Sequence, residues 1–205
     1  MAPPKQLRAA DLAPGDILLQ YNQSNIAGKL IAFGQAMVGD KNSELVHAGV
    51  MFDKTFMIEA LMQGITGSDI RVQNKSFAYR VFRPRNTALG QTEGNVVKFL
   101  FDHHQSHKSM RYSWRGAVAA IGTARPMSAD NVDRMMDDIF RLKPTAFFCS
   151  QFVVMSYQLA AAQMGLSPKS IFPFDDAKMP PSRLAMACES NPAFENIGYM
   201  QPNIR

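Results

Sequence analysis

The amino-acid sequence predicts an α+β fold, and three observations predict it. A segment with helical spacing near the N-terminus precedes a group of short runs rich in β-branched and aromatic residues, and longer helical patterns fill the rest of the chain. Strands grouped in one part of the chain favour an antiparallel sheet packed against helices over an alternating parallel sheet. The 205 residues and the apolar share of 46% suffice for one sizeable core, so we expect a single domain over residues 1–205.

The expected strands lie in the first half of the chain. A turn over residues 11–16 leads into a strand over residues 17–20. The next two runs, residues 45–52 and 55–61, predict a β-hairpin, and a further strand is expected over residues 77–83.

Helices are expected where apolar residues recur at helical spacing. These segments are residues 26–38, 92–104, 128–142 and 148–164. Thr92 is the expected N-cap of the second helix, and Gly165 stands where the last helix should end. Residues 109–123 fit neither pattern, and the tail, which is rich in Pro, Asn and Ser, is expected to wrap over the surface.

The two cysteines have different surroundings. Cys149 follows Pro144 and opens a long apolar helix, where unpaired backbone N–H groups and the helix dipole lower a thiol pKa and can hold an oxyanion. Cysteine is also a common core residue, so a packing role for Cys149 stays open. Cys188 has no comparable flank, and packing is the better interpretation for it.

A nucleophilic cysteine needs a base, and the base needs a group that orients it. His47 lies in a predicted strand beside the small residues Ala48 and Gly49. Glu59 lies in an apolar strand, where a carboxylate is costly unless it is paired. A hairpin loop of three residues, or a bulge, puts His47 and Glu59 on one face of the sheet, whereas a two-residue loop puts them on opposite faces.

Four short motifs stand in a recognisable order. They are Leu12-Ala13-Pro14-Gly15-Asp16-Ile17-Leu18, His47-Ala48-Gly49-Val50, Ile58-Glu59-Ala60 and Phe148-Cys149-Ser150-Gln151-Phe152. In this order the chain resembles the circularly permuted NlpC-type peptidases of the papain-like superfamily, a group related to the lecithin–retinol acyltransferase-like proteins. The histidine strand precedes the cysteine helix here, which is the permuted order.

The resemblance implies a permuted papain-like fold and a set of residue roles. Cys149 is the implied nucleophile at the start of a long helix, His47 the general base and Glu59 the group that orients the histidine. Tyr112 and Ser150 are the implied substrate-binding residues. No cofactor and no metal are implied. Residues 117–143 are longer than the pattern requires, and this helical insert would form a lid, bind a partner or extend the core.

The resemblance also implies an activity. It predicts a cysteine hydrolase that cleaves amide bonds through an acyl-enzyme, with peptidoglycan peptides as the preferred substrate. The basic charge and the lack of a signal peptide would fit a secreted antibacterial effector, and they would fit an intracellular lipid or peptide amidase as well. An inhibitor or immunity protein would then be a partner. Hydrolysis or transfer of lipid and other acyl groups is the alternative within the same fold.

Net charge and composition indicate which classes of binding partner the protein is expected to have. The formal net charge of +5 favours an anionic partner such as the cell wall, but no Lys/Arg run predicts nucleic-acid binding. No stretch of apolar residues is long enough for a transmembrane helix. The first residues lack the apolar run of a signal peptide, so we expect synthesis in the cytosol, with any export by a dedicated secretion system.

Two other classes of function remain open. His103 and His107 are spaced i,i+4, as metal-binding pairs are, with His104 between them, although a solvated helix end explains them better. The chain could also be a binding module that keeps the scaffold and has lost its activity.

Overall fold

Six extended segments of the chain form one antiparallel sheet. The computed structural model describes residues 5–22, 42–61, 63–107, 110–112, 145–173 and 179–202. The strands of the sheet are β1 (Ile17–Tyr21), β2 (Leu45–Met51), β3 (Phe56–Leu61), β4 (Gly64–Asp69), β5 (Tyr79–Pro84) and β8 (Phe194–Met200). Their order across the sheet is β4-β3-β2-β1-β5-β8, and each neighbouring pair is antiparallel.

Helices and one small sheet complete the described fold. The helices are the 3₁₀-helix η1 (Ala9–Asp11), α2 (Ile70–Gln73), α3 (Thr87–His107), α6 (Cys149–Gln163), α7 (Pro168–Ile171) and α8 (Pro181–Ser190). Strands β6 (Met110–Tyr112) and β7 (Thr145–Phe147) pair in parallel. Within the described residues the protein is therefore an α+β protein, as the sequence predicts.

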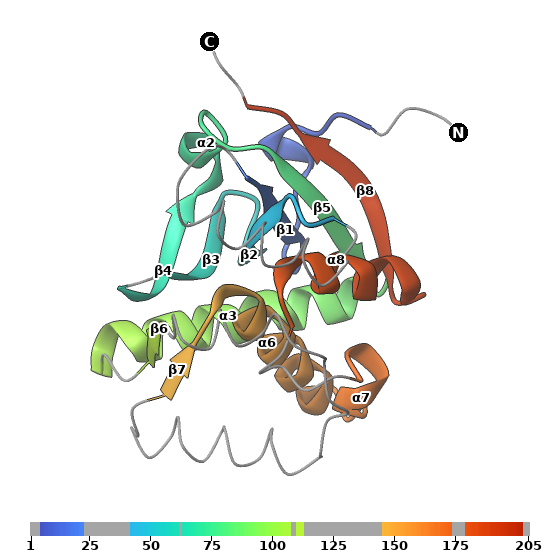
Figure 1. Ribbon diagram of the computed structural model, residues 1–205. Coiled ribbons are helices and arrows are strands. Elements are labelled where there is room, and N and C mark those ends of the chain that lie inside the picture. The colour runs from blue at the N-terminus through green and yellow to red at the C-terminus, as the bar shows by residue number, and fades with distance from the viewer. Residues whose placement is uncertain are drawn as a thin grey trace.

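The two faces of the sheet are buried by different parts of the chain. Alternate strand residues, among them Leu19, Val50 and Ile58, pack with α3, α6 and α8, and Figure 1 shows α3 and α6 together beneath the sheet. The opposite face carries Leu18, Met57 and Val81 and packs with Ile70 of α2 and with the segment around η1. Each face thus buries the apolar side chains that the period-two pattern of a strand presents to it.

The turn before β1 is where α3 approaches the sheet most closely. Gly15 adopts a φ of +81°, and a Cβ built on it would lie 2.5 Å from the Cα of Gly90 in α3. Asp16 is fully buried and accepts two hydrogen bonds from Arg83 of β5, at 2.7 and 2.6 Å. The turn therefore has a structural role.

Several elements follow the sequence prediction closely. Strands β1, β2, β3 and β5 and helix α6 lie where they were expected. The end of α6 has the expected glycine, because Gly165 has a φ of +71° and the N–H of Leu166 donates to the carbonyl of Ala161 at 2.9 Å. The helices expected at residues 26–38 and 128–142, and the insert at 117–143, lie outside the described residues.

Two expectations are wrong, and two elements were missed. Helix α3 begins at Thr87 and not at Thr92, because the side chain of Asn86 caps it by accepting from the backbone N–H groups of Ala88 and Leu89. Strand β4 and helix α2 were not expected at all. The tail does not merely wrap the surface, since it forms α8 and the edge strand β8 of the main sheet.

Candidate active site

The β2–β3 hairpin brings His47 and Glu59 onto one face of the sheet. Gly49 pairs with Glu59 and Met51 with Met57, so that Glu59 is a diagonal neighbour of His47. Nε2 of His47 lies 2.6 Å from Oε2 of Glu59. The carboxylate that the sequence marks as costly is thus paired in the folded chain.

The loop of this hairpin sets that register. The N–H of Phe52 donates to the carbonyl of Phe56 at 2.9 Å, which leaves a loop of three residues between them. Asp53 closes the loop, because its Oδ1 accepts from the N–H groups of Thr55 and Phe56 at 2.6 and 2.7 Å. The loop has the length that the pairing of His47 with Glu59 requires.

Cys149 approaches His47 from another part of the chain. It is the first residue of α6, after the N-cap Phe148, and is 3% exposed. Its side chain is hydrogen-bonded to His47, and its sulfur accepts from the backbone N–H groups of Ala48 and Ser150. The pairing of β2 with β3 starts at Gly49, so Ala48 and His47 are not paired with β3. The thiol therefore contacts β2 just outside the paired part of the hairpin.

The charges of the three groups reinforce one another. Burial raises the pKa of Cys149, but His47 and the two backbone N–H groups outweigh it and bring that pKa below its ordinary value. Burial lowers the pKa of His47, whereas Cys149 and Glu59 raise it, to about 10. Burial raises the pKa of Glu59, but hydrogen bonds from His47, Ser68 and Gln73 hold it below its usual range. At neutral pH the geometry therefore favours a thiolate, an imidazolium and a carboxylate.

Glu59 has further hydrogen-bond donors that sequence reasoning missed. Its Oε1 accepts from Oγ of Ser68 at 2.7 Å and from Nε2 of Gln73 at 3.0 Å. Ser68 belongs to β4 and Gln73 ends α2, the two elements that were not expected. The available signal was the polar alternation of Thr66 and Ser68 directly after the hairpin.

The two expected substrate-binding residues have different outcomes. Ser150 is fully buried and its hydroxyl donates to the carbonyl of Met179, so its side chain braces the start of α6 and is not presented to a substrate. A role of Ser150 in substrate binding, for example through its backbone N–H, stays a prediction. Tyr112 ends β6 and pairs with Phe147 of β7, two residues before Cys149. The side chain of Tyr112 lies outside the described residues.

The histidines of α3 and the second cysteine are not part of the Cys149–His47–Glu59 cluster. His103 and His107 share a face of α3 with ring centroids 4.7 Å apart, and His104 is buried. Within the part of the chain that the structure describes, no group of three or more metal-binding side chains is gathered. Cys188 is buried, and burial, with the charge of Glu189, raises its pKa. It is a packing cysteine, as its sequence context indicates.

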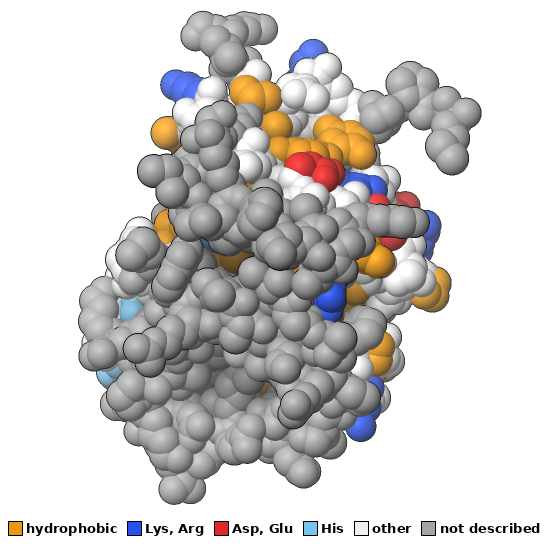
Figure 2. Space-filling model, in the orientation of Figure 1, with side chains coloured by type: hydrophobic (Ala, Val, Ile, Leu, Met, Phe, Trp, Pro, Cys, Tyr) orange, Lys and Arg blue, Asp and Glu red, His pale blue; other side chains and the backbone are white. Residues whose placement is uncertain are grey.

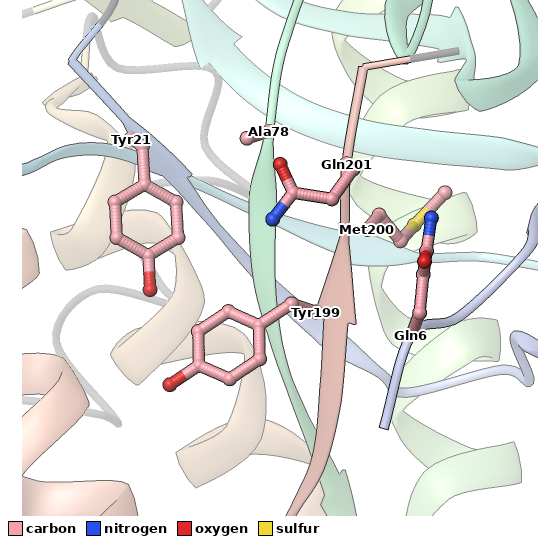
Figure 3. Close-up of a pocket in the computed structure, with 6 residues that line it drawn as sticks. All are labelled: Gln6, Tyr21, Ala78, Tyr199, Met200 and Gln201. Atoms are coloured by element: carbon pink, nitrogen blue, oxygen red, sulfur yellow. The ribbon is translucent and has the colours of Figure 1, made fainter. Parts of the chain in front are cut away.

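Two surface features lie outside the three-residue cluster. A cavity of about 460 Å³ lies at the ends of β1 and β8, and Figure 3 shows the side chains that line it: Gln6, Tyr21, Ala78, Tyr199, Met200 and Gln201. The rings of Tyr21 and Tyr199 are stacked there with centroids 6.1 Å apart.

On the described part of the face in Figure 2, Lys and Arg side chains are scattered and form no continuous patch. Among the described residues, no helix has the length and apolar character needed to cross a membrane.

No protein-family model matches the chain, and no curated protein matches it either.

Proposed function

We propose that this protein is a cysteine hydrolase of the circularly permuted, papain-like NlpC type, with Cys149 as nucleophile, His47 as base and Glu59 as the group that orients His47. One observation carries the proposal. A thiol at a helix start, an imidazole and a buried carboxylate, which are far apart in the sequence, form a continuous series of hydrogen bonds. A merely structural cysteine requires neither of the other two groups.

The acylation step uses the charges already present. The Cys149 thiolate attacks the carbonyl carbon of an amide and forms a C–S bond, and the carbonyl electron pair moves to oxygen. Backbone N–H groups in the first turn of α6, where a helix offers no preceding carbonyl to accept them, stabilise that oxyanion. The imidazolium of His47 then gives its proton to the leaving nitrogen as the C–N bond breaks. An amine leaves, and a thioester remains on Cys149.

Deacylation reverses the roles. Neutral His47 takes a proton from water, whose oxygen attacks the thioester carbonyl. The C–S bond breaks, a carboxylic acid leaves, and the thiolate–imidazolium pair is restored. Glu59 keeps its charge throughout, because it accepts hydrogen bonds and stabilises the cationic imidazole.

We propose peptide bonds of the bacterial cell wall as the substrate. The net charge of +5 supports this choice, because it attracts the protein to an anionic polymer. Mechanism alone does not distinguish these amides from other acyl bonds, which makes the substrate the part to test first.

Digestion of purified peptidoglycan tests the proposal. We expect mass spectrometry to find fragments cut at a peptide bond with the wild-type protein and with Cys188→Ala, which removes only the packing cysteine. We expect no such fragments with Cys149→Ala. Cleavage that persists in Cys149→Ala would refute the mechanism. Absence of cleavage by a wild-type protein whose Cys149 is a reactive thiolate would refute the cell-wall substrate and leave lipid or other acyl bonds to be assayed.

A further inference from the structure

A series of hydrogen bonds, each of them part-buried, continues behind Glu59, away from the thiol. Nε2 of Gln73 donates to Oε1 of Glu59 at 3.0 Å, and the Oε1 of Gln73 accepts from the hydroxyl of Tyr79 at 3.0 Å. Glu59 is 1% exposed and Tyr79 is fully buried. These hydrogen bonds therefore connect β5 to His47 through α2 and β3.

The strand registers show why these groups meet. Tyr79 pairs with Gln20 of β1, which in turn pairs with His47 of β2. Directly paired residues lie on the same face, so Tyr79 and His47 share the face that also carries Glu59. Helix α2 packs on this face through Ile70 and brings Gln73 over it.

The direction of the hydrogen bonds follows from the charges. An ionised carboxylate can only accept, so the amide group of Gln73 must present its NH₂ to Glu59. Its oxygen then faces Tyr79, whose hydroxyl must donate. Burial and the charge of Glu59 raise the pKa of Tyr79, so that the hydroxyl keeps its proton. Tyr79 thus selects the one amide orientation of Gln73 that stabilises Glu59 as an anion.

The position of Gln73 is itself fixed. The N–H of Ile70 at the start of α2 donates to the carbonyl of Thr55 in the hairpin loop, at 2.9 Å. Just after α2, the side chain of Asn74 donates to the carbonyls of Phe77 and Gln201, at 2.9 and 3.1 Å. Gln73 is therefore held at both ends of its short helix and has little freedom to leave Glu59.

We propose that Gln73 is a positioning residue, oriented by Tyr79, which keeps Glu59 ionised and directed at His47 and so sustains the Cys149 thiolate. This inference rests on the proposed function. Without the Gln73 donor, Glu59 loses a hydrogen bond that favours its charged form. The imidazolium is then less stable, and the pKa of the thiol rises.

The pH dependence of Cys149 alkylation tests this role without a substrate. Iodoacetamide reacts with the thiolate, and peptide mass spectrometry separates Cys149 from Cys188. We expect Gln73→Met, which keeps the length and removes the donor, to move the midpoint of the rate–pH curve upward by about one unit, equivalent to a tenfold loss of rate below the midpoint. The plateau rate at high pH should be unchanged.

Two further variants and one control complete the series. Gln73→Glu places a second acid against Glu59, and we expect it to give the largest upward shift. Tyr79→Phe keeps the ring in the core and removes only the oxygen that orients the amide, so we expect a smaller shift in the same direction. Tyr157→Phe is the matched control, because Tyr157 is also fully buried and donates to the carbonyl of Gly15, outside this chain of hydrogen bonds. It should lower stability and leave the midpoint where it is.

The outcomes separate the two proposals. A low midpoint in the wild type that Gln73→Met and Tyr79→Phe leave unchanged overturns the positioning role and leaves the hydrolase proposal standing. A wild-type midpoint at the ordinary thiol value overturns both. Should Gln73→Met fail to fold, Tyr79→Phe alone decides, since it changes one buried oxygen.

Discussion

His47 lies between the other two groups of the candidate site. Its Nε2 is 2.6 Å from Oε2 of Glu59, and its ring is also hydrogen-bonded to the side chain of Cys149. The imidazole side chain is 15% exposed, so water screens these interactions weakly. A histidine between an anion on each side is expected to stay protonated well above neutral pH, and its pKa of about 10 agrees with this.

The first prediction concerns the source of the thiol's acidity. In His47→Ala the burial of Cys149 remains while its cationic neighbour is lost, so the pKa of the thiol should rise above its ordinary value of 9.0. We expect alkylation of Cys149 near pH 7 to slow by more than about tenfold and to recover only at strongly alkaline pH. Cys188, measured in the same digest, should react slowly in both proteins. Equal and slow alkylation of the two wild-type cysteines would contradict a thiolate at Cys149.

At the scale of elements, the hairpin and the cysteine helix could be predicted because their signals are local. Alternation defines β2 and β3, and Gly165 and Pro168 mark the end of α6. The contact among Cys149, His47 and Glu59 was predicted from the family resemblance and from the requirement for a three-residue loop. The register itself depends on Asp53, whose side chain closes that loop.

The strands that could not be predicted from the sequence form because of tertiary contacts. Strand β4 contains Gly64 and Gly67, which weaken β-propensity, and it is a strand because all six residues pair with β3. Its polar residues, and Gln73 after it, could therefore not be assigned to Glu59. Strand β8 holds Gly198 at a φ of +136°, beside a shift of register in β5, and its signal is equally weak.

Helix α3 was expected to be shorter for a related reason. Gly90 and Gly94 lower its helix propensity near the N-terminus, but they let it approach the backbone of Pro14 and Phe52. The cap at Asn86 compensates in part for this lower helix propensity.

We expect Asn86→Ala to lower the free energy of unfolding by about 1 kcal/mol and Asn86→Asp to retain most of it. Urea denaturation measures both, and equal losses in the two variants would show that the side chain is not a cap.

The close packing of α3 on the turn before β1 gives a second prediction at this scale. Gly15 and Gly165 both have a positive φ, +81° and +71°, but only Gly15 has a neighbour that a Cβ would strike, the Cα of Gly90 at 2.5 Å. Gly165→Ala should cost about 1 kcal/mol, the price of the conformation alone. Gly15→Ala should cost clearly more, because backbone atoms must move apart. Thermal unfolding of the two variants would contradict the tight contact if they lost the same stability.

For the whole molecule, the core that joins α3 and α6 to the sheet contains a buried carboxyl group that the proposed mechanism does not use. Glu93 of α3 is fully buried, with its Oε1 2.6 Å from Oγ of Ser156 in α6. Its Oε2 has no hydrogen-bond partner among the described residues. Burial raises the pKa of Glu93 to about 8, although the hydrogen bond to Ser156 lowers it somewhat. The two helices therefore pack around a neutral carboxylic acid at neutral pH.

This acid makes the stability of the whole domain depend on pH in a definite direction. The unfolded chain releases the Glu93 proton near its ordinary pKa of 4.5, whereas the folded protein holds it up to about pH 8. The folded state thus binds more protons over that interval, and stability falls as the pH rises through it. Glu93→Gln, an uncharged isostere, should match the wild type within about 1 kcal/mol near pH 4.5 and exceed it near pH 9 by an amount on the order of 5 kcal/mol. His47 and Glu59 titrate alike in both proteins, so the difference between the two stability–pH curves, measured by urea denaturation, isolates Glu93. Parallel curves would mean that the core accommodates the charged carboxylate, with water or a cation beside it.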